Sequence, residues 1–107
     1  MSESALQMSI VQALQLRGIY AFSVPNEALG KINARLGYNR MGRLKAMGLR
    51  AGVADLVCIL PGRVVFLEVK TDKGRQSPAQ IDFEKVCTDL GHDYYVVRSV
   101  TDALAVF

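Results

Sequence analysis

Three charged residues, Asp55, Glu68 and Lys70, lie in a stretch that is otherwise apolar and β-branched. Pro61 and Gly62 interrupt this stretch, which predicts a hairpin. If the turn is centred there, Asp55 faces Glu68 across the ladder, with Cα atoms about 5 Å apart. Lys70 follows Glu68 by two residues and therefore points to the same face. The pattern predicts two carboxylates and one ammonium at one end of a sheet.

Such a cluster could hold a metal ion and act on a phosphodiester. Two carboxylates set opposite one another repel and destabilise a hairpin, and burying them without a partner costs still more free energy. A cation bound between them would turn this destabilising contribution into a stabilising one. Mg²⁺ accepts one or two carboxylates and leaves room for water and a phosphate oxygen. It lowers the pKa of water and neutralises charge developing on phosphorus. Lys70 would orient the attacking hydroxide and stabilise the added negative charge.

The alternative needs no metal. Lys70 could pair with Glu68 or Asp72 at the surface, and such pairs contribute little. Asp55 would then be a turn residue at the entry to its strand. A bulge in the hairpin turn would also move Asp55 away from Glu68.

Two further residues are candidates for the same site. Glu3 precedes Leu6 and Ile10 at helical spacing, which places it on the buried side of the first helix, where it could complete the shell of the cation. Taken by itself, it is better explained as an acid favoured by the helix dipole. Gln80 could reach a metal-bound water or a phosphate, or it could only close a capping box with Ser77.

The elements that must position these residues follow from periodicity, caps and turns, and their predicted order is αβββαβα. The strand after the turn is apolar on both sides and is expected to be central in the sheet. The predicted ranges are a helix from Ser2 or Ser4 to Gly18, strands at 19–24, 53–60, 64–70 and 94–98, a helix at 77–91, a short helix starting at Ser99, and a loop at 26–48 with a short helix around 31–36.

The composition is that of one ordinary globular domain spanning residues 1–107, since half of the residues are hydrophobic. No apolar run approaches the roughly 20 residues that cross a bilayer, and the N-terminus lacks a signal pattern, so a cytoplasmic protein without a membrane partner is expected. Cys58 and Cys87 fall among apolar neighbours and outside any metal-binding spacing. They are predicted to be reduced core residues.

Positive charge is concentrated in one segment, residues 26–50, in which Glu27 is the one acid. A basic patch fits a polyanion such as DNA, because cations placed along phosphates release counterions. A solvated surface loop is the alternative. The candidate DNA-binding residues are Lys31, Arg35, Arg40, Arg43, Lys45 and Arg50, with Lys73 and Arg75 after the second hairpin strand.

Two remaining features carry little chemistry. His92 is the one histidine, follows a helix-ending glycine and is expected to be a surface turn residue. Tyr94 and Tyr95 are expected at the edge of the core, although one ring could contact DNA.

In this order, several segments resemble the VRR-NUC nucleases, a branch of the PD-(D/E)xK phosphodiesterase superfamily. The resemblance spans nearly the whole chain. The segments are Glu3 in the first helix, "VPNE" at 24–27, "GVADL" at 52–56, "FLEVKTDKGRQSPAQ" at 66–80 and "GHDYYVVRS" at 91–99.

The resemblance implies a restriction-endonuclease-like αβββαβ core with a mixed sheet flanked by helices. It also implies a Mg²⁺- or Mn²⁺-dependent endonuclease without a small-molecule cofactor. The catalytic residues would be Asp55, Glu68, Lys70 and Gln80, and the metal ligands Glu3, Asp55, Glu68 and the carbonyl of Val69. Small members resemble homodimeric enzymes that cut branched DNA such as Holliday junctions.

One departure from the family pattern is visible. Ala54 stands before Asp55, where the family usually has proline, which shapes the backbone and carries no chemistry. Two other function classes stay open: a restriction-like or nicking nuclease on ordinary duplex DNA, and a non-catalytic nucleic-acid-binding module of the same fold.

Overall fold

The computed structural model describes residues 1–25 and 38–107. The first helix, α1, spans Glu3–Leu16. It begins at Ser2, whose hydroxyl accepts a hydrogen bond from the Ala5 N–H at 3.0 Å. Leu6, Ile10 and Leu14 recur every fourth residue, and all three are buried. This apolar stripe holds α1 against the sheet.

The sheet has four strands in the spatial order β1-β2-β3-β4. The strands are β1 (Tyr20–Ser23), β2 (Leu56–Leu60), β3 (Arg63–Val69) and β4 (Asp93–Val97). β1 and β3 both run antiparallel to β2, which lies between them, and β4 runs parallel to β3. The mixed sheet and the central position of the strand after the turn are therefore confirmed.

The hairpin register is the predicted one, because Leu60 pairs with Arg63 and Leu56 with Leu67. A bulge has not shifted the register within these pairs. The strand β2 begins at Leu56, three residues later than predicted, and Asp55 directly precedes it. Gly52, with φ +83°, turns the chain just before this point.

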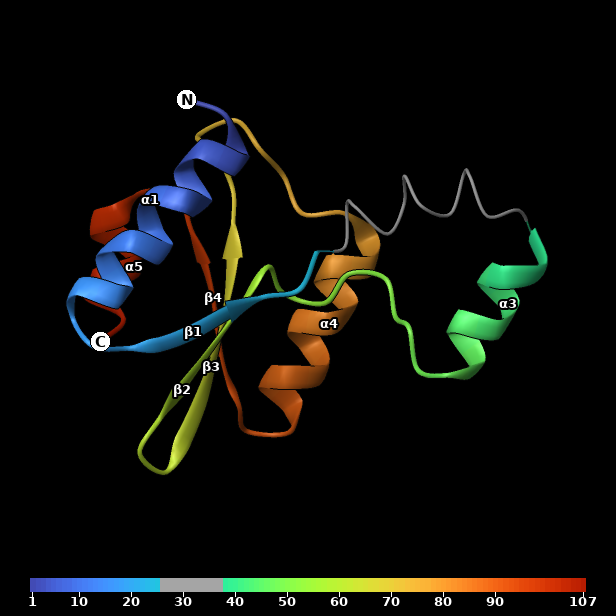
Figure 1. The fold of residues 1–107 in the computed structure, drawn as a ribbon. Coiled ribbons are helices and arrows are strands. Elements are labelled where there is room, and N and C mark those ends of the chain that lie inside the picture. Colours follow the sequence, from blue (N-terminus) through green and yellow to red (C-terminus); the bar gives the residue numbers. More distant parts are fainter. Residues whose placement is uncertain (26–37) are drawn as a thin grey trace.

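Helices cover the two faces of the sheet unequally (Figure 1). On one face, α1 and the short helix α5 (Val100–Ala105) pack together over a core. On the other face lies α4 (Pro78–Asp89), where Phe83 makes edge contacts with Phe66 of β3 and Tyr94 of β4. The core contains Leu6, Ile10, Leu14, Leu56, Cys58, Val65, Leu67, Val69, Val97 and Ala103.

One helix was not predicted. The range 26–48 was expected to be mainly loop, yet α3 spans Tyr38–Ala46 within it. Gly42 lies in its middle and weakens any helical signal, because glycine is a poor helix former. The helix stands away from the sheet in Figure 1. The expected short helix around 31–36 lies outside the described residues.

The observed element order is αβαββαβα, which is the predicted order with α3 added. Cys58 and Cys87 are free and buried, as expected. His92 is exposed after Gly91, Tyr94 is half-buried and Tyr95 is more exposed. Within the described ranges, no helix has the length and apolar character needed to cross a membrane.

Candidate active site

Asp55 is held at the end of the hairpin by backbone contacts on both sides. Its Oδ2 accepts a hydrogen bond of 2.8 Å from the Val69 N–H, and its carbonyl oxygen accepts one of 2.9 Å from the Val24 N–H. The carboxylate is half-buried. Asp55 therefore points toward the end of β3, beside Glu68.

Glu68 is the most deeply buried acid of the site, with a side chain that is 0% exposed. Its Oε1 accepts a hydrogen bond of 3.0 Å from Gln80 Nε2 at the start of α4. Its Oε2 is buried and has no hydrogen-bond partner, the one such side-chain atom among the described residues. A buried carboxylate oxygen without a partner is costly, and most native structures avoid it.

Lys70 brings the third acid to the cluster. Its Nζ lies 3.8 Å from Glu68 Oε1 and 4.0 Å from Glu3 Oε1. The Lys70 side chain is only 9% exposed, whereas that of Glu3 is 32% exposed. The ammonium therefore sits between a strand acid and a helix acid instead of in a surface pair with Asp72.

Gln80 does both of the things that the sequence left open. Its Oε1 accepts a hydrogen bond from the Ser77 N–H at 2.8 Å, and the Ser77 hydroxyl accepts one from the Gln80 N–H at 3.2 Å. This is a complete capping box. Because the Oε1 end closes the cap, the Nε2 end is turned toward Glu68 and holds one of its oxygens in place.

The charges of the cluster act most strongly on Glu68. Burial raises the pKa of Glu68 to about 9 from an ordinary value of 4.5. A hydrogen bond with Asp55 and repulsion from Asp55 and Glu3 act in the same direction, while Lys70 opposes them. Two ionised carboxylates offer only acceptors, so a hydrogen bond between Glu68 and Asp55 can form only when one of them carries a proton. The three acids around Lys70 carry more negative charge than its one ammonium can balance, so a proton or a bound cation is needed to neutralise the rest.

The raised pKa predicts how the stability of the metal-free chain depends on pH. An acid with a pKa raised in the folded state adds stability below its unfolded pKa and loses it as pH rises toward the folded pKa. Between pH 5 and pH 8 we expect the free energy of unfolding to fall by roughly 2 kcal/mol or more because of Glu68. Glu68→Gln should remove this fall. Urea denaturation in a chelator at several pH values measures it, and equal slopes in both proteins would contradict the prediction.

The donor set fits a hard divalent cation. Asp55 and Glu68 supply carboxylate oxygens, and the buried Oε2 of Glu68 is an acceptor with nothing to accept. Among the described residues, no three His, Cys, Asp or Glu side chains are arranged to hold a metal ion by themselves. A pair of carboxylates matches the coordination preference of Mg²⁺, which usually binds one or two carboxylates and keeps several water ligands.

Gly52 is a site residue that the spacing of charges did not reveal. A Cβ at this position would collide with the Ala79 backbone carbonyl group and lie 2.7 Å from the Gln80 nitrogen. Its φ of +83° is also one that side chains rarely adopt. The loop before Asp55 can therefore pack directly on the first turn of α4, which carries Gln80. Its place in "GVADL", three residues before Asp55, was the available signal.

Comparison with known proteins identifies the family of this chain. The sequence profile of the VRR-NUC domain matches residues 1–101. The chain belongs to the VRR-NUC family. A solved structure named "VRR_NUC domain protein" superposes with a TM-score of 0.71 at 16% identity, covering 99% of this chain and 84% of that one. No curated protein matches the chain.

This VRR-NUC chain therefore has the nuclease-type fold that the sequence predicted, with the αβββαβ core intact and α3 inserted between its first two strands. The structure brings Glu3, Asp55, Glu68, Lys70 and Gln80 to one end of the sheet. Val69 joins them through its backbone N–H. The role of its carbonyl oxygen stays a prediction.

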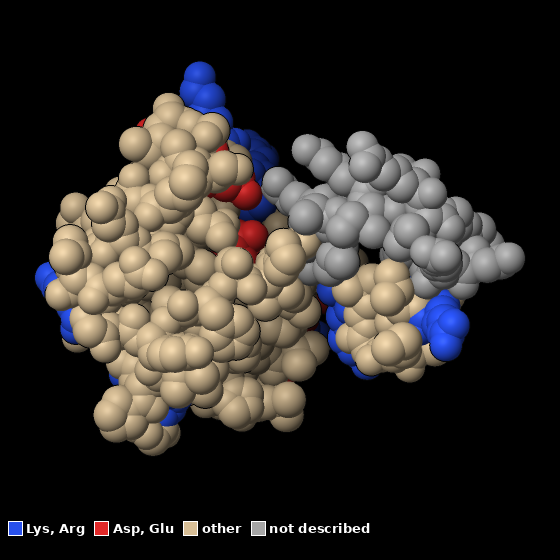
Figure 2. All heavy atoms as spheres, viewed as in Figure 1, with Lys and Arg blue, Asp and Glu red and all other residues tan. Residues whose placement is uncertain are grey.

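The basic residues of the VRR-NUC chain are less tightly grouped. Arg43, Lys45 and Arg50 are exposed on and after α3, and Lys73 and Arg75 are exposed in the loop after Lys70. Figure 2 shows Lys and Arg side chains on both sides of α3. Arg40 lies in α3, but its side chain, like Lys31 and Arg35, lies outside what the structure describes.

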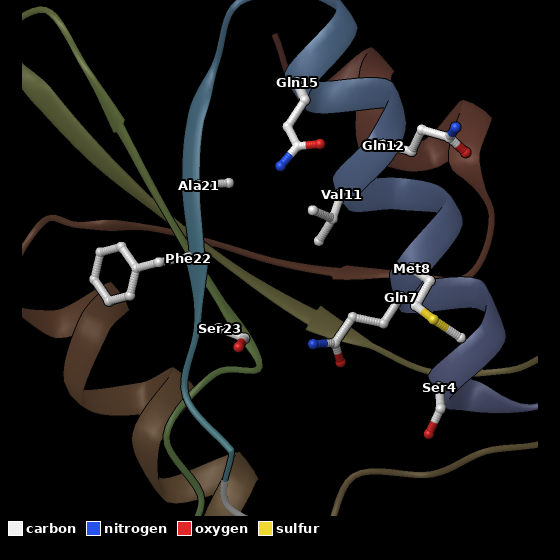
Figure 3. Close-up of a pocket in the computed structure, with 9 residues that line it drawn as sticks. All are labelled: Ser4, Gln7, Met8, Val11, Gln12, Gln15, Ala21, Phe22 and Ser23. Carbon is white, nitrogen blue, oxygen red and sulfur yellow. The ribbon is translucent and has the colours of Figure 1, made fainter.

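A groove of about 560 Å³ between α1 and β1 is separate from the acidic cluster. Figure 3 shows Gln7, Gln15 and Ser23 directed into it, whereas Phe22 points to the opposite side of β1. None of the residues that line it is ionisable. The groove therefore offers no acid or base that could take part in catalysis.

Proposed function

We propose that this chain is a divalent-metal-dependent endonuclease that cuts branched DNA, such as Holliday junctions, by attack of water on the phosphodiester. The observation that carries the proposal is the pairing of Asp55 with buried Glu68 beside Lys70, with one Glu68 oxygen left without a partner. A structural ion pair would not need a second carboxylate next to it.

Asp55 and Glu68 would hold the cation, Mg²⁺ or Mn²⁺, with the Val69 carbonyl as a further ligand. Glu3, which lies 4.0 Å from the Lys70 ammonium, would have to turn toward the ion to join them, because no three acids of the described residues are arranged to bind one ion. When bound, such an ion lowers the pKa of water and neutralises charge on the phosphate. The protein holds the two carboxylates ready for this. The Val69 N–H orients Asp55, and the Gln80 amide orients Glu68.

Lys70 has a separate role. Its ammonium is a donor that is largely shielded from solvent and is held near two acids at 3.8 and 4.0 Å. In this position it can donate to the attacking water and to a non-bridging phosphate oxygen, where negative charge grows as the bond to phosphorus forms. Gln80 would act with it by keeping Glu68 fixed.

DNA would be held by exposed basic side chains on two sides of the cluster. Lys73 and Arg75 lie in the loop after Lys70, and Arg50 begins the segment that leads to Asp55. The proposed set is Lys31, Arg35, Arg40, Arg43, Lys45, Arg50, Lys73 and Arg75. Contacts of this kind make binding fall steeply with salt.

The test is a panel of four-way junction, flap and linear duplex DNAs, incubated with Mg²⁺, with Mn²⁺ or with a chelator. The proposal expects cuts in branched DNA only when metal is present. Equal cutting of linear duplex would favour the restriction-like or nicking alternative. Salt-sensitive binding without any cleavage would favour the non-catalytic module.

We also propose that the chain acts as a homodimer, because two symmetric cuts in a junction need two sites. A surface suited to a second copy is the half of the sheet that α4 leaves bare. There Tyr20, Phe22, Ile59 and Val64 are exposed, and Ile59 pairs with both Tyr20 and Val64 across the ladders. Light scattering should give twice the chain mass, and Ile59→Lys should halve it. A monomeric parent with full activity on junctions would rule the dimer out.

A cytoplasmic location also remains part of the proposal. It rests on the two free cysteines, Cys58 and Cys87, since disulfides are rare in reducing compartments.

A further inference from the structure

The loop after Lys70, residues 71–76, is tied down in a way that the nuclease signature does not explain. It links the end of β3 to Ser77, the cap of α4, and it carries the exposed side chains of Lys73 and Arg75. Loops with exposed basic residues are usually mobile because few contacts hold them. This one is bound at several points by side chains from other elements.

The main tie is Arg98, which directly follows β4. Its Nη1 donates to the carbonyl oxygens of Thr71 at 2.7 Å and Gly74 at 2.8 Å, with a longer contact of 3.5 Å to the Asp72 carbonyl. One nitrogen thus bridges both ends of a turn that is closed by a 2.9 Å bond from the Gly74 N–H to the Thr71 carbonyl. The carbonyl groups of the loop face inward, toward the guanidinium.

Arg98 is itself well anchored. Its backbone N–H donates to Asp102 Oδ2 at 3.0 Å, and Ser99 caps α5 directly after it. The preceding residue, Val97, accepts a hydrogen bond of 3.0 Å from the Lys70 N–H through its carbonyl. The end of β4 therefore holds both the backbone of Lys70 and the loop that follows it.

The loop in turn touches the side chain of Lys70. A Cβ at Gly74 would lie 3.4 Å from Lys70 Cδ and 3.3 Å from the Thr71 carbonyl oxygen. Gly74 therefore lies beside the aliphatic stem of Lys70, close enough that an added Cβ would be in van der Waals contact with it. This contact helps to explain why the Lys70 side chain is only 9% exposed and why its ammonium points at Glu68 and Glu3.

The far end of the loop is fixed as well. Gln76 Nε2 donates to Tyr94 Oη at 3.2 Å and approaches Glu84 Oε1 at 3.4 Å. With its inward carbonyls on Arg98 and its end on Tyr94, the loop can present Lys73 and Arg75 to solvent in a set direction. Donors that are already ordered lose less entropy on binding.

We propose that Arg98 is a positioning residue of this nuclease site. Its hydrogen bonds to the loop carbonyls hold Gly74 beside the aliphatic stem of Lys70. They also fix the loop so that Lys73 and Arg75 are preorganised to bind the DNA backbone. This inference rests on the function proposed above. In this scheme Arg98 acts through the loop, whose carbonyl oxygens its Nη1 binds.

The first experiment needs no activity. In Arg98→Met we expect the loop amides, Gly74 above all, to exchange hydrogen at least about tenfold faster, because their opening is no longer held by the guanidinium. Lys70 should be acylated faster by acetic anhydride, as read by mass spectrometry. The control is Arg63→Met, which loses one positive charge and an exposed pair with Asp93 at the opposite end of β3. Unchanged loop exchange or Lys70 labelling in Arg98→Met would overturn the inference.

The second experiment uses labelled four-way junction DNA with Mg²⁺. Arg98→Met should lower the single-turnover rate at saturating DNA on the order of 10- to 100-fold, the usual effect of a small misplacement of a catalytic group. It should also weaken binding. The double substitution Lys73→Ala, Arg75→Ala should weaken DNA binding less in the Arg98→Met background than in the parent, because Arg98 acts through these two residues. If the effects on binding free energy are fully additive, Arg98 does not act through them.

A second variant guards against simple unfolding. Gly74→Val leaves Arg98 in place, but its branched side chain extends beyond the Cβ position that already lies 3.4 Å from Lys70 Cδ, so it should displace the stem, speed Lys70 labelling and slow cleavage while the melting temperature stays near that of the parent. If Gly74→Val changes neither, the contact between loop and stem has no role. If the parent cuts no DNA, the proposed function fails, whereas the exchange and labelling results still decide whether Arg98 positions the loop and Lys70.

Discussion

Asp55→Asn is expected to abolish metal-dependent cleavage and, at the same time, to make the metal-free chain more stable. The cleavage rate should fall on the order of 10³-fold, because one of the two anionic ligands is lost. Asparagine keeps an oxygen that can accept the 2.8 Å bond from the Val69 N–H, so the hairpin end should keep its shape. DNA binding should be retained.

The stability gain has a separate cause. Asp55 is one of the groups that raise the pKa of Glu68, and its removal leaves Glu68 with less repulsion in its buried position. We expect a gain of about 1 kcal/mol near pH 8, measured by urea denaturation in a chelator. The opposite signs of the two effects distinguish an active-site acid from a structural one, whose loss would lower both activity and stability.

The matched control for this variant is Asp89→Asn at the end of α4, which removes an exposed acid away from the cluster. It should change neither cleavage nor stability measurably, since exposed charges contribute little. If Asp55→Asn cuts four-way junctions as fast as the parent, the reaction takes place elsewhere on the chain.

Gly52→Ala is expected to have the largest effect on folding. The new Cβ would meet the Ala79 carbonyl group and the Gln80 nitrogen, which are backbone atoms of a capped helix and cannot move aside like the end of a side chain. Its φ of +83° adds strain. A loss of about 3 kcal/mol or more is expected, together with loss of cleavage, because the loop before Asp55 must leave the start of α4.

Gly62→Ala in the hairpin turn separates the two causes. Its φ of +72° is similar, but a Cβ there would meet nothing within 4 Å. This control should cost only about 1–2 kcal/mol, the conformational term alone. Thermal or urea denaturation of both variants gives the comparison. Equal losses would mean that the close approach of Gly52 to α4 adds nothing.

The main features of the site could be read from local sequence signals. The Pro-Gly turn and the alternation of Val64, Phe66 and Glu68 specify a register in which Asp55 and Glu68 meet, since a slip by one residue would turn every side chain to the other face. The capping box at Ser77 and Gln80 is equally local. Signals of this kind involve residues within a few positions of one another or across one tight turn, so the chain order reveals them.

Other features depended on contacts between distant parts of the chain. Arg98 reaches the carbonyls of Thr71 and Gly74 more than 20 residues away, and Gly52 lies against the backbone of Ala79 at the start of α4. The pairing of Lys70 with Glu3 likewise depends on how α1 packs over the core. No periodicity records such contacts, because packing of whole elements sets their distances. The acidic pair could therefore be expected from the residues alone. The contacts that orient Lys70 and Gln80 toward it, made by the loop held by Arg98 and by Gly52, could be recognised only in the tertiary structure.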